Sequence, residues 1–229
     1  MNEKSSIMNA LRVTGYSLSC LVFAALLVIA VAVSIQTFRL ETSSLGRVLL
    51  HDSLAVGFVA FFGVFLIPRL RRNFEWLMKF THEFTHLVLA IVFFRKIYRF
   101  KVDDSDSYVS YSNGWFGYHA ITLSPYCLPL FTLALLPWRF TTGAPLFLAA
   151  IDALIGFTYA FHICCWVKQT RLHQTDLTGP GVILSLLIVA TVHLLNLCLV
   201  VLTPSSGVFV AIQRVFWEFP SSFVLSVIR

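Results

Sequence analysis

Long apolar runs limit what this chain can fold into. A run of about 20 apolar residues is enough to cross the hydrocarbon core of a bilayer as one helix. Six candidates occur: Leu11 to Gln36, Leu50 to Pro68, Asn73 to Phe94, Tyr118 to Pro137, Pro145 to Val167, and Val182 to Leu202. Backbone polar groups in lipid must be paired within a segment, and the ten-residue alternating strands of a barrel are absent from the sequence. The sequence therefore predicts an all-α, polytopic transmembrane bundle of about six spans.

The composition supports a membrane location. The chain is 58% hydrophobic and 12% charged, against roughly 45–50% and about 25% in soluble domains, and its mean hydropathy is +0.81. The N-terminal apolar run is too long for the core of a signal peptide, so we interpret it as a retained first span. We expect a multi-pass integral membrane protein of a bacterial inner membrane or a plasma membrane.

The formal net charge of +6 has a membrane explanation. Lys and Arg residues that flank spans fix topology and meet anionic lipid head groups, so the expected partner is the lipid bilayer and not nucleic acid. All five cysteines fall within predicted spans, where thiols behave as small buried apolar groups. No disulfide framework or CxxC metal motif is present.

The motifs divide the chain into three regions. Residues 1–72 hold two predicted spans without a recognisable motif, 73–204 form the core, and 205–229 are an amphipathic tail at the membrane interface, interrupted by Arg214, Glu218 and Pro220. After the third span, "RFKV" and "YVSYS" alternate apolar and polar residues around the turn-forming "DDSDS". This pattern predicts a small β-hairpin at the membrane surface, roughly Arg99 to Ser112.

The stretch "KFTHEFTHLVLA", Lys79 to Ala90, carries the strongest functional signal. On a helix, His82 and His86 share one face, and Glu83, the residue after His82, lies beside that face. This is the HExxH arrangement. Two neutral imidazoles can bind one Zn²⁺, and the glutamate can act as the general base toward a water that zinc has made acidic. Ionisable groups at the bilayer centre cost about 2.5 kcal/mol or more unless compensated. The pattern therefore predicts a functional zinc site.

A catalytic zinc site needs a third protein ligand and an open fourth position. Asp176 in "HQTDLTGPGVIL" precedes a Gly-Pro-Gly break, so it could line a polar cavity at membrane depth or accept the first free amides of the last span. Asp152, within a span, is an alternative. His162 is another, although it could equally support a ligand from outside the coordination sphere. His193 has less support, because a lone histidine on an apolar face is usually a satisfied core residue.

Three features together resemble a known family: "HEFTH" in a transmembrane helix, the polar strand-like insert directly after it, and the later "TDLTGPG". They resemble the intramembrane zinc metalloproteases of the site-2 protease type (peptidase family M50), over approximately residues 73–202. The resemblance implies a zinc endopeptidase that cleaves a peptide bond in or near a transmembrane segment of a membrane protein substrate. It also implies His82, His86 and Asp176 as zinc ligands and Glu83 as the base.

The expected mechanism follows from the chemistry of such a site. A substrate helix must unwind locally, and the predicted hairpin could hold the unwound segment by strand addition. Glu83 would pass a proton from water to the leaving amine, and a nearby donor would stabilise the oxyanion. Three donors stay open at this point: His162, His173 and Asn196.

Two other classes of function are compatible with the motif. In a transporter or a proton or metal relay, the face formed by His82, Glu83 and His86 would bind the transported ion. That hypothesis predicts further ionisable residues along one path, and the spans offer little beyond Asp52 and Lys79. An inactive M50-like scaffold would be expected to have a damaged motif, whereas this one is intact. The sequence predicts neither the residues that bind substrate nor the oligomeric state.

Overall fold

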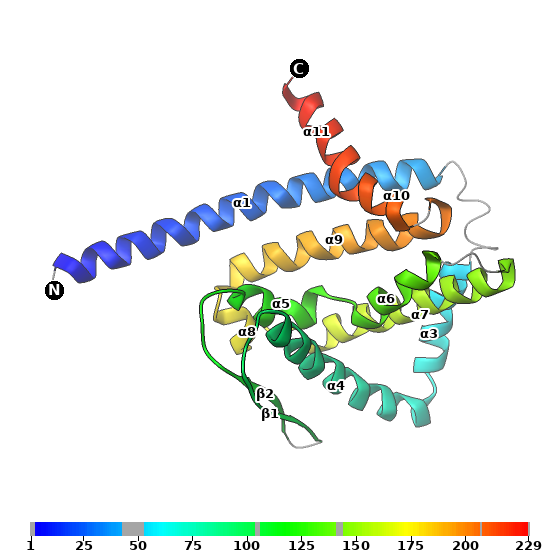
Figure 1. The fold of residues 1–229 in the computed structure, drawn as a ribbon, viewed down its shortest axis with the longest axis horizontal. Coiled ribbons are helices and arrows are strands. Elements are labelled where there is room, and N and C mark those ends of the chain that lie inside the picture. The colour runs from blue at the N-terminus through cyan, green and yellow to red at the C-terminus, as the bar shows by residue number, and fades with distance from the viewer. Residues whose placement is uncertain (1–2, 43–52, 104–105, 141–143, 207, 229) are drawn as a thin grey trace.

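The computed structural model describes residues 3–42, 53–103, 106–140, 144–206 and 208–228. Over these residues the chain is mostly helical, with one small antiparallel sheet. The long helices α1 (Glu3–Thr42) and α9 (Val182–Ser206) lie side by side, and α7 (Pro145–Gln169) runs along the opposite side of α9 from α1 (Figure 1).

Five parts of the described chain are long and apolar enough to be considered as membrane spans. Three are single helical segments: Arg12–Thr37, Pro145–Gln169 and Val182–Pro204. The other two are bent pairs, α3 (Ser53–Phe65) with α4 (Pro68–Val92), and α5 (Tyr118–Cys127) with the segment Leu130–Arg139, which holds α6 (Leu130–Leu135) and most of η1 (Leu136–Phe140). The structure is thus consistent with a membrane protein of three to five spans.

The expected count of about six spans is not confirmed, and the bends explain why. The second and third predicted spans are α3 and α4, which meet at a 109° bend and together make at most one span. At 13 residues α3 is too short to cross a bilayer, and Pro68 occupies the first turn of α4, where its missing N–H costs nothing. Residues 50–52 of the second predicted span lie outside the described residues.

The fourth predicted span, Tyr118 to Pro137, is also broken. Helix α5 ends at Cys127, and α6 starts after Pro129 at an angle of 85°. Pro129 has no N–H with which to continue the helical hydrogen bonds. The side chain of Asn196 in α9 donates to the carbonyl oxygen of Cys127 at 2.7 Å. This hydrogen bond satisfies one of the acceptors that the break leaves free.

Two glycines allow α3 and α7 to cross closely. A Cβ at Gly57 would collide with the backbone carbonyl oxygen of Ala153, and a Cβ at Gly156 would collide with that of Leu54. Beside this crossing, Phe61 is fully buried among aromatic rings from α3, α4 and α7. The crossing and the aromatic cluster hold α4, with its two histidines, against α7.

The predicted hairpin is confirmed. Strand β1 (Ile97–Val102) pairs antiparallel with β2 (Ser107–Tyr111), with Phe100 opposite Val109. The backbone N–H of Asp106 donates to Oδ1 of Asp103 at 2.6 Å, which closes the turn. Both strands pack beside α4 (Figure 1), so β2 runs close to the histidine helix.

The segment after α9 folds into short helices where the sequence predicts an amphipathic tail over 205–229. These are α10 (Val208–Gln213), one π-helical turn η2 (Arg214–Glu218) and α11 (Phe219–Ile228). Helix α11 lies against α1, and the side-chain amide of Gln36 donates to the hydroxyl of Ser222 at 3.3 Å. This segment is remote from α4 (Figure 1).

Candidate metal centre

Helix α4 presents the HExxH residues as the helical period predicts. His82 and His86 lie one turn apart with ring centroids separated by 5.0 Å, and their rings are nearly perpendicular. Both side chains are mostly buried, with 10% and 8% of their surface exposed. The face that they form is directed toward the connection between α7 and α9.

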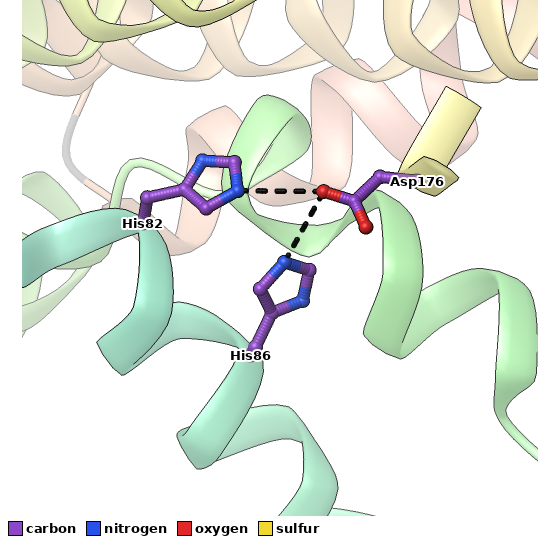
Figure 2. Close-up of side chains that lie close together, drawn as sticks. All are labelled: His82, His86 and Asp176. Carbon is purple, nitrogen blue, oxygen red and sulfur yellow. Dashed lines mark ion pairs between the residues drawn. The ribbon is translucent and has the colours of Figure 1, made fainter. Parts of the chain in front are cut away.

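That connection supplies Asp176. Gln174 precedes the single-turn helix α8 (Thr175–Thr178), Asp176 stands in its first turn, and Gly181 adopts a positive φ of 102° where the chain turns into α9. Oδ2 of Asp176 lies 3.4 Å from Nε2 of His82 and 3.5 Å from Nε2 of His86. Figure 2 shows both imidazoles directed at this one oxygen.

The three side chains form a group that could hold a metal ion. One ligand atom from each residue lies within 4.8 Å of the others. Imidazole nitrogens and a carboxylate oxygen are common metal ligands. The Asp176 side chain is 25% exposed, so an ion could reach the group from one side.

Hydrogen bonds on the far side of each ring orient the two histidines. Nδ1 of His86 lies 2.9 Å from the carbonyl oxygen of Ile121, and Nδ1 of His82 lies 3.3 Å from Oε1 of Gln169. Since both partners are acceptors, Nδ1 is the donor in each ring. In a neutral imidazole this leaves Nε2 as an unprotonated acceptor. The Nε2 lone pairs of both rings then face a carboxylate oxygen, so three acceptors lie close together. A bound cation, or protonation of the rings, would remove the repulsion between them.

Asp176 has further neighbours. The hydroxyl of Tyr126 in α5 lies 3.2 Å from Oδ2 of Asp176 and 2.9 Å from Oε1 of Gln174. Burial acts to raise the pKa of the Asp176 carboxyl, but when His82 and His86 are protonated at Nε2 their hydrogen bonds and charge outweigh burial, and the net shift is downward. The carboxylate is therefore ionised at neutral pH, as a metal ligand must be.

A cavity of about 310 Å³ opens beside the three residues. Glu83 lines it with His82, His86 and Asp176, and it has further walls from β2 and from the residues before α8: Ser107, Tyr108, Val109, Tyr111, Gln174 and Thr175. The carboxylate of Glu83 also interacts with the backbone of Val109. The predicted base thus shares one polar cavity with the metal-ligand group and with a strand.

The other predicted third ligands lie elsewhere. Oδ1 of Asp152 is 2.7 Å from Nε of Arg139, in a buried ion pair. The ring of His162 packs 5.3 Å from that of His193, between α7 and α9. None of these side chains lines the cavity. Of the candidates considered from the sequence, Asp176 alone joins the two histidines in the described part of the chain.

The three candidate oxyanion donors considered from the sequence do not lie at the cavity either. Asn196 is engaged with the Cys127 carbonyl, and neither His162 nor His173 lines the cavity. The polar side chains that do surround the metal-ligand group include Tyr126 and Gln169, which sequence reasoning missed. The sequence offered one signal, a polar residue, Gln169, at the end of an apolar run. Such a position does not indicate which distant side chain the residue contacts.

Comparisons with protein-family models, with curated proteins and with solved structures found no match to this chain. The interpretation of the site therefore rests on its own geometry and on the HExxH spacing.

Proposed function

We propose that this chain is an intramembrane zinc-dependent endopeptidase of the site-2 protease type, which hydrolyses a peptide bond in or near a transmembrane segment of a membrane protein substrate. One observation carries the proposal. His82, His86 and Asp176 converge within 4.8 Å at the wall of a cavity that Glu83 also lines. A set of three metal ligands beside a carboxylate that is not a ligand, within an apolar helical chain, suits hydrolysis in a membrane.

Zinc fits this donor set better than other common metals. Two histidines and one carboxylate form a known catalytic zinc set, with an open position for water or substrate. Ligand atoms on a tetrahedral zinc are about 3.3 to 3.5 Å apart, given metal–ligand bonds of about 2.0 to 2.2 Å. The separations of 3.4 and 3.5 Å between Asp176 and the two imidazoles agree with that edge, and all three ligand atoms lie within 4.8 Å of one another. A zinc ion held here would act as a Lewis acid toward water and a peptide carbonyl.

The residues of the chain have separable roles in this proposal. Glu83 takes the proton of an attacking water and delivers it to the departing amide nitrogen. Strand β2 offers an edge along which an unwound substrate segment can pair by strand addition, and Ser107, Val109 and Tyr111 of this strand line the cavity. Burial of the histidines among helices keeps bulk water away from their outer hydrogen bonds.

The proposal is tested in cells that produce the wild type, Glu83→Gln or Glu75→Gln. Glu75 is the matched control, because it is a carboxylate on the same helix that pairs with Arg71 and Lys168 outside the cavity. New N-termini in the membrane proteome are identified by mass spectrometry, and zinc is measured in each purified protein. We expect cleavages within transmembrane segments for the wild type and Glu75→Gln, and none for Glu83→Gln.

Glu83→Gln should still bind zinc, because Glu83 is outside the ligand set. Zinc in all three proteins without any cleavage that depends on Glu83 would contradict the protease and favour a metal relay. The same cleavages in Glu83→Gln and the wild type would also exclude Glu83 as the base.

A further inference from the structure

A second polar cavity lies further along β2 from the metal-ligand group. It measures about 290 Å³, and its walls include Arg95, Asn113 and Tyr118. Val109 and Tyr111 line both this cavity and the one beside the histidines. The two cavities are therefore neighbours on one strand, with the Ser107 end of β2 at the metal-ligand group and the Asn113 side at Arg95.

The guanidinium of Arg95 is built into this cavity. One of its terminal nitrogens, Nη2, donates to the carbonyl oxygen of Phe116. A Cβ at Gly114 would collide with the guanidinium, so the absence of a side chain at Gly114 makes room for it. Nε of Arg95 is buried and has no hydrogen-bond partner among the described residues. Nε itself is covered, but the Arg95 side chain is partly exposed and lines the cavity, so an anion there would compensate a guanidinium whose own hydrogen bonds are incomplete.

The chemistry of the walls selects an anion. Apart from Arg95, the polar side chains that line the cavity are neutral, from Ser, Asn and Tyr residues, and none of the carboxylates in the described part of the chain lines it. Burial is the main influence on the Tyr111 phenol and raises its pKa, so it stays a protonated donor. Arginine recognises carboxylates through its planar set of N–H donors. The cavity thus offers one fixed positive charge and several donors to a carboxylate.

We propose that the Arg95 cavity binds an acidic side chain of the substrate, two or three residues from the scissile bond. This inference rests on the proposed endopeptidase function. Val109 and Tyr111 are two positions apart on one face of β2, which is about 7 Å along a strand. Because both residues line both cavities, a peptide paired with β2 and cleaved at the histidines would continue along this shared stretch toward Arg95, and we base the proposed offset of two or three positions on that overlap.

The test measures peptide binding to zinc-loaded, detergent-purified Glu83→Gln protein. The probes are fluorescent, terminally blocked nine-residue peptides of alanine and valine, with one glutamate two or three positions to either side of the centre, and the same peptides with glutamine. We expect at least one glutamate peptide to bind about tenfold more tightly than its glutamine partner, a difference of about 1.4 kcal/mol. The added substitution Arg95→Gln should abolish this preference, and Arg95→Lys should retain part of it.

Lys96→Gln is the matched control, because it removes an equal charge from the neighbouring position and Lys96 does not line the cavity. Equal binding of glutamate and glutamine peptides by protein with Arg95 intact would overturn the proposal even if the Arg95 variants fold poorly. So would a preference that survives Arg95→Gln. Binding of an anionic phospholipid that depends on Arg95, without a glutamate preference, would assign the cavity to a lipid head group and reject the proposal.

Cleavage of the same peptides by the wild type separates the two proposals. Binding that depends on Arg95, without cleavage that depends on Glu83, supports the acidic subsite and contradicts the endopeptidase. Equal cleavage of the glutamate and glutamine peptides supports the endopeptidase and contradicts the acidic subsite.

Discussion

Nε2 of His82 lies 3.4 Å from Oδ2 of Asp176, although the two residues come from different elements, α4 and the single-turn helix α8. His86 reaches the same oxygen at 3.5 Å. Both imidazoles donate from Nδ1 to carbonyl oxygens, so their unprotonated Nε2 atoms face the carboxylate. We therefore expect removal of any one of these three side chains to weaken metal binding more than it destabilises the fold.

Asp176→Ala should abolish stoichiometric zinc binding, and Asp152→Asn should not. Asp176 shares the cavity wall with both histidines, whereas Asp152 pairs with Arg139. We expect about one zinc per folded wild-type chain and an affinity at least about 100-fold lower in Asp176→Ala, beyond the range seen when only outer partners are lost. Elemental analysis of the monodisperse fraction checks this. Zinc retained by Asp176→Ala but lost by Asp152→Asn would reverse the ligand assignment.

Gln169→Leu should weaken zinc binding without removing a ligand. Oε1 of Gln169 accepts from Nδ1 of His82 at 3.3 Å, which fixes the ring orientation and leaves Nε2 unprotonated. Loss of such a partner typically lowers metal affinity by about 10- to 100-fold. Gln169→Glu, with a stronger acceptor, should keep or raise the affinity, which a competition titration against a chelator measures.

Gln213→Leu is the control for that titration, because Gln213 donates to Glu218 in the C-terminal segment, remote from the site. An unchanged affinity in Gln169→Leu would show that the bond to His82 does not orient the ring.

Tyr126→Phe should affect the site through Asp176. The hydroxyl donates toward Oδ2 of Asp176 and Oε1 of Gln174, while the ring packs 5.3 Å from that of His82. Phenylalanine keeps the ring and loses the donor, so we expect a decrease of about tenfold in zinc affinity. The matched control is Tyr159→Phe, whose hydroxyl donates to the His193 carbonyl oxygen at 3.5 Å among the described residues. Equal zinc affinities in the two variants would contradict a role for the Tyr126 hydroxyl.

Gly57→Ala should destabilise the fold, and Gly63→Ala on the same helix should not. A methyl group at Gly57 would meet the backbone carbonyl of Ala153 at the crossing of α3 and α7, whereas no atom of the described residues lies within 4 Å of a Cβ at Gly63. Overpacking of this kind costs about 1–3 kcal/mol, and alanine at an open helical position gains up to about 1 kcal/mol. Thermal unfolding of both variants in one detergent compares them. Similar midpoints would mean that α3 and α7 can separate without cost.

The elements that depend on local chemistry were predictable from the sequence. Apolar runs indicated the helices, because lipid requires each segment to satisfy its own backbone. The spacing of His82, Glu83 and His86 fixed their common face, because the helical period is local. The hairpin followed from alternation around a turn, and β1 and β2 occupy the predicted positions.

Tertiary structure decided what the spacing could not. The bend of 109° between α3 and α4 reduced the number of possible spans, because whether a proline turns the chain or continues it depends on the packing around it. Asp176, Asp152 and His162 were open alternatives from their residue types alone. The fold turns Asp176 toward the histidines and pairs Asp152 with Arg139, because long-range contacts between side chains are set by helix packing and not by neighbours in the sequence.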